Sequence, residues 1–498
     1  MTTVMFRGQR IEPDVFEQRV QRSVNALRTL GLGDGDVVAL MLHNGPDLLE
    51  LMLAARAIGA YWCPINWHFK VEELRHILDD SGARLLVVDA ALWPAVSAAA
   101  APSLPVVLAG DAGDTDVSNP AQLRWTMLRD AAAPRVNPPT TPRSAMLYTS
   151  GTTGQPKGIR REPATAQQAA HTDDRLRRVI GSEPGMRALL NAPMYHSAPN
   201  SFAMAVALND GLLVLEERFD AEATLALIEQ HAVTHAYLVP TMYVRLLRLP
   251  ESIRLRHDLS SLRFISSTGS PCPPAVKQAM IEWWGPVIHE AYGSSELSYM
   301  TLLTSEQALR KPGSAGLALP GVELRILGDD GNPKPRGEAG MIYVKPNLLA
   351  DFSYNHGDAA RRAMERDGYL TMGDVGYLDD DGFLFIVDRA ADMVISGGVN
   401  IYPAEIEAVL QLMPGVADCA VFGIPDPEFG ERLCAAVMPV AGAGLDAATV
   451  QAWLRERLAG YKVPAVVSLH HELPREDTGK IFKRRLREPY WQGVERRI

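Results

Sequence analysis

Short apolar runs alternate with helical patterns along this chain, and that alternation limits the folds it can adopt more than any other feature. Residues 13–31 carry apolar side chains at helical spacing, and a buried strand is expected over 37–42. The order continues with a helix over 46–59, a strand over 61–65, a helix over 71–80 and a strand over 83–89, and it returns over 185–240. Strands that alternate with helices favour parallel sheets covered by helices. Residues 110–143 lack such periodicity and are interpreted as a loop-rich connector.

The length and composition are typical of a globular protein with more than one domain. At 498 residues the chain exceeds a single typical core, so two or three domains are expected. The net charge of −10 argues against a nucleic-acid partner, which usually requires a basic face. We find neither a signal peptide nor an apolar run of the roughly 18 residues that a transmembrane segment needs. A cytoplasmic location is therefore expected, with the four cysteines as free thiols.

The clearest domain boundary falls near residue 388. Before it, residues 376–388 have the pattern of a β-hairpin that turns at Gly382. After it, Pro403 suits the first turn of a helix. Further elements are expected as strands over 417–421 and 434–439 and a helix over 446–459. The pattern predicts an N-terminal domain over 1–388 and a C-terminal domain over 393–498, with the boundary at residues 389–392, which the family resemblance described below implies to be a hinge.

A loop rich in Thr, Ser and Gly follows the strand that ends at Tyr148. It reads Tyr148-Thr-Ser-Gly-Thr-Thr-Gly-Gln-Pro-Lys157-Gly158. Glycines let backbone N–H groups approach a phosphate, hydroxyls add donors, and a lysine supplies positive charge. The loop is not a Walker A loop, because Lys157-Gly158 lacks the following Ser or Thr that would bind Mg²⁺. We favour phosphate binding over the alternative, a polar surface turn.

Four more motifs follow this phosphate loop. Two of these motifs contain Asp374 and Arg389, and either residue taken alone is more often a surface charge than a ligand. His196 lies outside the motifs, and a lone histidine is more often structural. The motifs are Tyr292-Gly-Ser-Ser-Glu296, Thr371-Met-Gly-Asp374, Asp388-Arg-Ala-Ala-Asp-Met-Val-Ile-Ser-Gly-Gly398 and Leu473-Pro-Arg-Glu-Asp-Thr-Gly-Lys480-Ile481. In this order, and over nearly the whole chain, the five elements resemble the adenylate-forming superfamily of acyl-CoA synthetases, peptide-synthetase adenylation domains and luciferases.

The resemblance implies both a fold and a reaction. The expected fold is a large N-terminal α/β domain, with parallel-rich sheets covered by helices and a small β-barrel-like portion, and a small mobile C-terminal α+β lid. The expected chemistry needs ATP, Mg²⁺ and coenzyme A. It converts a carboxylic acid to acyl-AMP and pyrophosphate and then transfers the acyl group to the CoA thiol.

The resemblance also implies roles for particular residues. Lys480, Glu296, Thr152 and Lys157 would be catalytic, and Glu296 and Thr152 would bind Mg²⁺. The residues expected to bind the nucleotide are Thr149, Ser150, Gly151, Thr153, Gly154, Gly269, Ser270, Pro271, Glu290, Ala291, Tyr292, Gly293, Ser294, Ser295, Asp374 and Arg389. Among them, Tyr292 would stack on adenine and Asp374 would accept from both ribose hydroxyls.

The lid and the acid pocket complete the expected site. Gly397 and Gly398 would leave a channel for the pantetheine arm of CoA, and the lid would rotate about Ala391, where the family usually has Asp or Lys. His196, Ser197 and Asn200 would border the acyl pocket. The chain also has Ser295 where the family usually has Thr, which keeps the hydroxyl.

Several alternatives stay open for the function. We expect an acyl-CoA synthetase for a medium- or long-chain fatty acid or a bulky alicyclic acid, with aryl acids as the next choice. The rival inside the superfamily is a stand-alone adenylation enzyme that loads a separate carrier protein. A third reading, a catalytically silent nucleotide-binding protein, is disfavoured because the motif lysines, carboxylates and arginine are all retained. Assembly into a homo-oligomer is left open.

Overall fold

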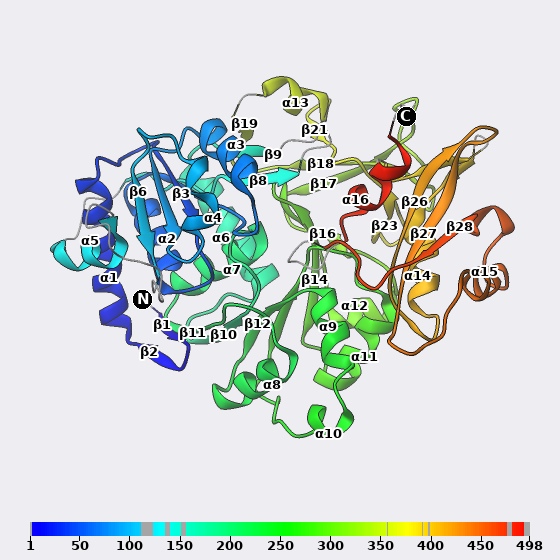
Figure 1. Ribbon diagram of the computed structural model, residues 1–498, viewed down its shortest axis with the longest axis horizontal. Helices are drawn as coiled ribbons and strands as arrows, with labels where there is room; N and C mark the ends of the chain where they lie inside the picture. The colour runs from blue at the N-terminus through cyan, green and yellow to red at the C-terminus, as the bar shows by residue number, and fades with distance from the viewer. Residues whose placement is uncertain are drawn as a thin grey trace.

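The computed structural model describes residues 2–110, 123–134, 140–150, 156–355, 357–390, 392–396, 399–475 and 481–492. Figure 1 shows a large part that holds the blue to yellow segments and a smaller part, mainly orange and red, beside it. No helix in the described ranges is long and apolar enough to cross a membrane. The four cysteines are buried and free.

A five-stranded parallel sheet forms from the N-terminal residues, as the alternating pattern predicts. Its strands, in spatial order, are β4 (Tyr61–Pro64), β3 (Val37–Met41), β5 (Leu85–Asp89), β6 (Val106–Ala109) and β7 (Leu123–Arg124). The accompanying helices are α1 (Pro13–Thr29), α2 (Pro46–Ala57), α3 (Val71–Ser81), α4 (Trp93–Val96) and α5 (Trp125–Ala131).

The prediction of a loop-rich connector over 110–143 is wrong in its middle, where α5 forms. Trp125, the first residue of that helix, is fully buried, and the helix contacts α1. One large buried aromatic side chain stabilises a helix too short to show a helical period, which is why the pattern missed it.

A nine-stranded sheet forms the centre of the large part, parallel from β1 to β14 with antiparallel strands at its edges. Its strands, in spatial order, are β16 (Leu317–Ala318), β15 (Ser298–Leu303), β14 (Ile288–Ser294), β13 (Phe264–Ser267), β12 (His235–Leu238), β10 (Met186–Leu190), β11 (Gly211–Leu215), β1 (Thr3–Phe6) and β2 (Gln9–Ile11). Its helices are α6 (Ala166–Ile180), α7 (Ser197–Ala207), α8 (Ala221–Gln230), α9 (Pro240–Leu247), α10 (Glu251–Arg254), α11 (Pro274–Trp284) and α12 (Ser305–Arg310).

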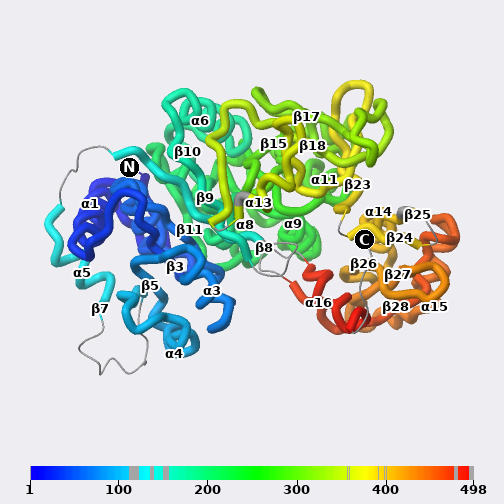
Figure 2. Tube along the Cα trace, turned by 90° about the horizontal axis from the view of Figure 1, so that it is seen from above, coloured from blue at the N-terminus to red at the C-terminus, as the bar shows by residue number. Residues whose placement is uncertain are grey.

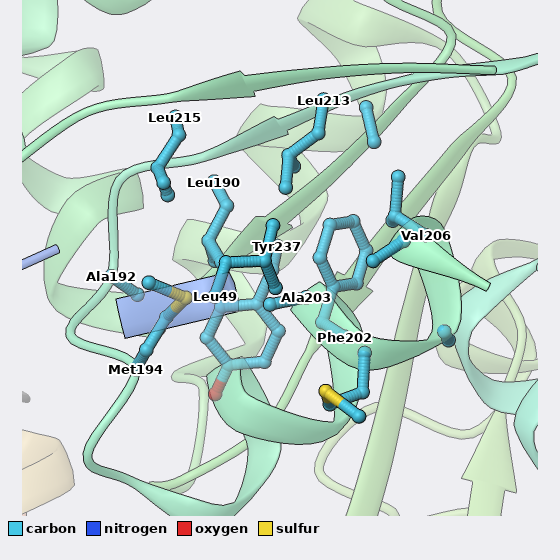
Figure 3. Close-up of a cluster of buried hydrophobic side chains, with 14 of the residues drawn as sticks. Leu49, Leu190, Ala192, Met194, Phe202, Ala203, Val206, Leu213, Leu215 and Tyr237 are labelled. Carbon is cyan, nitrogen blue, oxygen red and sulfur yellow. The ribbon is translucent and has the colours of Figure 1, made fainter. Parts of the chain in front are cut away.

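The core of this sheet lies against α7. Figure 3 shows Leu190 and Leu213 of the sheet near Phe202 and Val206 of α7, with Tyr237 of β12 beside them. The ring centroids of Phe202 and Tyr237 are 6.0 Å apart. One face of the apolar run that begins at Phe202 therefore belongs to the hydrophobic core.

Two antiparallel sheets complete the large part. The three-stranded sheet has the order β19 (Phe352–Tyr354), β9 (Pro156–Arg161) and β8 (Leu147–Ser150). The six-stranded sheet contains β17 (Val322–Leu327), β18 (Gly340–Pro346), β20 (Glu365–Arg366), β21 (Tyr369–Leu370), β22 (Asp374–Leu378) and β23 (Leu384–Arg389), with α13 (Asp358–Ala363) nearby in sequence. The sequence analysis expected a small β-barrel-like portion, and this six-stranded sheet corresponds to it. Its strands, as far as the structure describes them, pair as a branched sheet. The hairpin that turns at Gly382 is present as β22 and β23.

The smaller part is an α+β unit with its own buried core. Its sheet contains β25 (Val399–Ile401), β24 (Val394–Ser396), β27 (Gly430–Pro439), β26 (Val416–Asp426) and β28 (Val466–Leu469), and its helices are α14 (Pro403–Gln411), α15 (Ala447–Arg455) and α16 (Lys483–Arg487). Pro403 occupies the first turn of α14 as expected, while α15 is shorter than the predicted helix over 446–459. Figures 1 and 2 both place α16 between the large part and the β26–β27 hairpin.

A buried ionic cluster joins α1, α2 and α5. The carboxylate of Glu50 is fully buried and lies 2.6 Å from Arg19 Nε and 3.1 Å from Arg129 Nη1. Arg129 also reaches Asp47 at 3.3 Å. Because ions leave water at a large cost, removing one member of such a cluster leaves the others poorly compensated.

We predict that Glu50→Ala lowers the stability of the protein by about 3 kcal/mol, since it leaves two arginines without their buried partner. Scanning calorimetry measures the fall in thermal midpoint. The matched control is Glu12→Ala, which removes an exposed ion pair with Arg10 at 2.8 Å and is expected to change the midpoint little. Equal shifts for the two variants would contradict the role of burial.

Candidate functional site

One cleft collects the candidate residues. It is lined from the large part by loops after β10, β12, β13 and β14, and from the smaller part by residues of α14, β26 and α16. Every candidate that the structure describes lines this cleft, except Ser150, whose backbone pairs with Pro156 at the end of β8. The carboxyl ends of parallel strands meet at one edge of a sheet, so loops distant in sequence converge there.

Eight candidates lie outside the described residues. They are Gly151, Thr152, Thr153, Gly154, Ala391, Gly397, Gly398 and Lys480. Their roles stay predictions. On either side of the segment 476–480, Arg475 and Ile481 pair with each other and both line the cleft.

The β14–β15 hairpin presents Glu296. Gly293 is required in this hairpin, because a Cβ there would lie 2.9 Å from Tyr299 Cα and closer still to the carbonyl oxygen of Ser298. Ser298 has a φ of 58°, a left-handed conformation that the turn imposes on a non-glycine residue. The turn leaves Glu296 only 4% exposed at the wall of the cleft.

The Glu296 carboxylate is held by two hydroxyl donors. Thr149 Oγ1 donates to Oε1 at 3.0 Å, and the phenol of Tyr354 donates to the same oxygen at 3.2 Å. The ammonium of Lys157 lies 5.6 Å from the centroid of the Tyr354 ring, within cation–π range. Thr149, Lys157 and Glu296 are thus brought together, and Tyr354 contacts the last two.

Arg161, at the end of β9, supports the main chain of the same turn. Its guanidinium donates to the carbonyl oxygens of Ser295, at 2.9 Å, of Glu296, and of Ala350, at 3.1 Å. Burial lowers the pKa of Arg161 to about 10, and the charge of Glu296 opposes that shift. The sequence analysis named neither Arg161 nor Tyr354. Nothing in the local pattern distinguishes Arg161 from the adjacent Arg160.

The strands β8 and β9, which flank residues 151–155, are held by a separate network. Tyr148 Oη donates to Asp80 Oδ2 of α3 at 2.5 Å, and Asn355 Nδ2 donates to the same carboxylate oxygen at 3.0 Å. A Cβ at Gly158, opposite Tyr148 in the β8–β9 ladder, would lie 2.8 Å from the Tyr148 hydroxyl. Glycine is therefore needed there for close packing.

A second group joins three candidates near the junction of the two parts. Tyr292 Oη donates to Asp374 Oδ2 at 2.5 Å, and Arg389 Nε lies 3.2 Å from Asp374 Oδ1. Asp374 is 6% exposed, while the Arg389 side chain is half exposed. Burial and then the charge of Asp374 raise the pKa of Tyr292, so its phenol stays a donor.

The remaining nucleotide candidates differ in their surroundings. Gly269, Ser270 and Pro271 form the turn after β13, and Gly269 has a φ of 100°. Ala291 is buried in the core beside the six-stranded sheet. Glu290 forms a buried ion pair with Lys277 of α11 at 2.7 Å, and burial raises the pKa of Glu290 while Lys277 opposes the shift.

The acyl-pocket candidates begin α7. Ser197 Oγ accepts from Ser295 Oγ at 3.1 Å, which connects this helix to the β14–β15 turn. Asn200 is buried, where Oδ1 accepts from Trp62 Nε1 at 3.2 Å and Nδ2 donates to the Met194 carbonyl at 2.9 Å. Burial lowers the pKa of His196 to about 4, so its imidazole is neutral at pH 7.

The face of α7 toward the cleft is polar in its first turns and apolar after them. Its lining residues are Ser197, Ala198, Pro199, Asn200, Ser201, Met204 and Ala205, followed by Leu208, and Pro240, Thr241 and Val244 of α9 line the same cleft. Such a surface can bury an apolar group, since the contact removes hydrocarbon from water.

Comparison with known proteins identifies the same family along most of the chain that the motifs resemble. A family model described as AMP-binding enzyme matches residues 2–351, and one described as AMP-binding enzyme C-terminal domain matches residues 405–480. A feruloyl-CoA synthase from Amycolatopsis sp is 36% identical over 98% of this chain and 96% of its own length. The long-chain-fatty-acid–CoA ligase FadD13 of Mycobacterium tuberculosis is 34% identical over 94% of this chain and 91% of its own. The crystal structure of ATP-bound MatB from Rhodopseudomonas palustris superposes with a TM-score of 0.84, at 29% identity, over 98% of this chain and 96% of that one.

We predict that His196 makes stability depend on pH. A histidine with a folded pKa near 4 and an ordinary value of 6.5 contributes stability above pH 6.5, which is lost as the pH falls toward 4. Thermal midpoints of the wild type and His196→Gln are compared at pH 7.5 and pH 5. The wild type is expected to lose more stability than the variant on acidification. Parallel losses would show that His196 does not titrate in this way.

Proposed function

The chain belongs to the AMP-binding enzyme family, in its acyl-CoA synthetase branch, and on this basis we propose an ATP-dependent ligase that joins a bulky, largely apolar carboxylic acid to the thiol of CoA. The observation that carries the proposal is the convergence of Thr149, Glu296 and Asp374 on one cleft. Acid–thiol ligases of this branch use ATP, Mg²⁺ and CoA, and the cleft offers separate places for a nucleotide and an apolar group.

The Tyr292–Asp374–Arg389 group is suited to the nucleoside. One oxygen of the Asp374 carboxylate accepts a hydrogen bond from Tyr292 and the other is ion-paired with Arg389, and each keeps a lone pair for a ribose hydroxyl. The same bond fixes Tyr292, whose ring then presents a flat surface for adenine. We assign the half-exposed Arg389 to the ribose and the phosphates, because a guanidinium can grip two oxygens at once.

The surroundings of Glu296 fit a magnesium ion shared with phosphates. No group of three or more His, Cys, Asp or Glu side chains that could hold a metal occurs among the described residues. Mg²⁺ is commonly bound by one or two carboxylates together with substrate phosphate oxygens, so a single carboxylate is sufficient. Bound there, Mg²⁺ would neutralise charge on the phosphates. Glu296 would hold it, with Thr152 as the further ligand proposed from sequence.

The first half-reaction brings two anions together, the acid carboxylate and the α-phosphate. We assign the compensating charge to Lys480, whose sequence neighbours Arg475 and Ile481 line the cleft. Lys157 and the hydroxyls and glycines from Thr149 to Gly154 are assigned to the departing β- and γ-phosphates. A fixed cation at a developing charge acts in a site from which water is largely excluded, where its effect is large.

The acid is proposed to lie between α7 and α9. The neutral His196 and the apolar side chains of Ala198, Met204 and Ala205 favour an uncharged, apolar acyl group, either aliphatic or aryl. A feruloyl-CoA synthase and a fatty-acid ligase among the relatives support both kinds.

The second half-reaction is assigned to a rotation of the C-terminal unit. We propose the boundary at residues 389–392, with Ala391 as the pivot and Gly397 and Gly398 as the walls of the pantetheine channel. Separate cores on the two sides of this junction support the division. Asp388 spans it, since its carboxylate accepts from the backbone N–H of Arg389 at 2.7 Å and of Ala404 at 3.0 Å.

The proposal is tested by pyrophosphate release with a panel of acids. Octanoate, palmitate, cyclohexane carboxylate and ferulate are each supplied with ATP and Mg²⁺, with and without CoA. We expect release that depends on an apolar acid and acyl-CoA product only when CoA is present. Release without transfer to CoA would favour the rival function, loading of a separate carrier protein. No release with any acid would contradict the proposed chemistry.

We predict that Lys480→Ala reduces acyl-AMP formation roughly 100- to 1,000-fold, as expected for loss of one stabilising charge at a developing anion. Transfer from supplied acyl-AMP to CoA is expected to change far less, and single-turnover assays measure each step. The control is Lys462→Ala, which removes a lid lysine paired with Glu405 at 2.6 Å. Equal loss in both half-reactions would contradict the assignment of Lys480.

A further inference from the structure

Tyr354 lies where two parts of the proposed ATP site meet. Its ring belongs to the core beside the six-stranded sheet and meets Phe352 edge-on, with centroids 5.7 Å apart. Its hydroxyl donates to Oε1 of Glu296 at 3.2 Å. The ammonium of Lys157 lies over its ring, 5.6 Å from the ring centroid. One side chain, 8% exposed, therefore touches both the phosphate-loop lysine and the buried carboxylate.

The direction of the hydrogen bonds at Glu296 determines which oxygen is available. An ionised carboxylate only accepts, so the phenol and Thr149 are the donors. Both donate to Oε1, and Oε2 accepts no hydrogen bond from the residues that the structure describes. Two donors on Oε1 restrain the carboxylate and leave Oε2 as the oxygen available to a cation.

The main chain that carries Glu296 is fixed independently. Arg161 donates to the carbonyl oxygens of Ser295 and Glu296, so the Cα position does not depend on Tyr354. Loss of the phenol alone therefore changes the orientation of the carboxylate and leaves its location unchanged.

We infer that Tyr354 is a positioning residue with two separable contacts: its hydroxyl orients Glu296 for Mg²⁺, and its ring holds Lys157 for the phosphates. This rests on the proposed function. Partners of ligating carboxylates typically contribute 10- to 100-fold to metal affinity, so losing the hydroxyl should cost about 10-fold. The ring contact should instead affect ATP binding at every Mg²⁺ concentration.

The test measures binding without turnover. ATP raises the thermal midpoint of a protein that binds it, and the rise is followed across a series of Mg²⁺ concentrations with no acid or CoA present. For Tyr354→Phe we expect the Mg²⁺ concentration at half-maximal stabilisation to increase about 10-fold, with the full wild-type shift recovered at saturating Mg²⁺. For Tyr354→Leu, which also removes the ring, we expect a smaller shift even at saturating Mg²⁺.

The matched control is Tyr369→Phe. That phenol also donates to a glutamate, Glu323, at 2.5 Å, and it lies outside the residues that line the cleft. Its Mg²⁺ dependence is expected to match the wild type. An unchanged Mg²⁺ half-point in Tyr354→Phe would overturn the inference and leave the proposed function standing. A wild-type protein that ATP fails to stabilise at any Mg²⁺ concentration would overturn both.

Discussion

The buried carboxylate of Glu296 is the group on which the geometry of the site depends. A buried charge is costly unless it is hydrogen-bonded and compensated, and here two hydroxyls and the nearby charge of Arg161 provide the compensation. Those partners come from β8, β9 and β19, so satisfying one carboxylate joins the three-stranded sheet to the β14–β15 hairpin. The same contacts place the stems of the phosphate loop beside the strand end that carries Tyr292.

A second polar contact joins the β14–β15 hairpin to the six-stranded sheet, near the junction of the two parts. Tyr292 and Glu296 belong to one motif, yet Tyr292 contacts Asp374 of β22 while Glu296 contacts β8 and β19. The short hairpin thus faces two antiparallel sheets at once. Arg389, which pairs with Asp374, is both the last residue of β23 and the first residue of the proposed hinge. The proposed rotation at that point would move the C-terminal unit while Tyr292 and Asp374 stay on the large part.

Much of the fold was predictable, because local patterns are strong wherever strands and helices alternate. The first sheet, the β22–β23 hairpin and the helix that opens at Pro403 were all expected. The helix α5 was missed because its stability comes from burial of Trp125 and not from periodicity. Family resemblance indicated Glu296 and Asp374 as site residues. It did not indicate Arg161 or Tyr354, since Arg161 is one of two adjacent arginines and Tyr354 ends a short strand, β19, with no motif of its own.

The sequence by itself determined the family, the order of the loops and the chemistry that is proposed for those loops. These follow from residue types within short segments, where glycines, hydroxyls and charges are adjacent in the chain. Only the tertiary structure decided which oxygen of Glu296 is bonded, that Tyr354 serves two partners, and that Glu290 pairs with Lys277. These contacts join residues far apart in the sequence, and no local pattern encodes them. Their geometry comes from the way parallel strand ends and antiparallel sheets pack around a few buried charges.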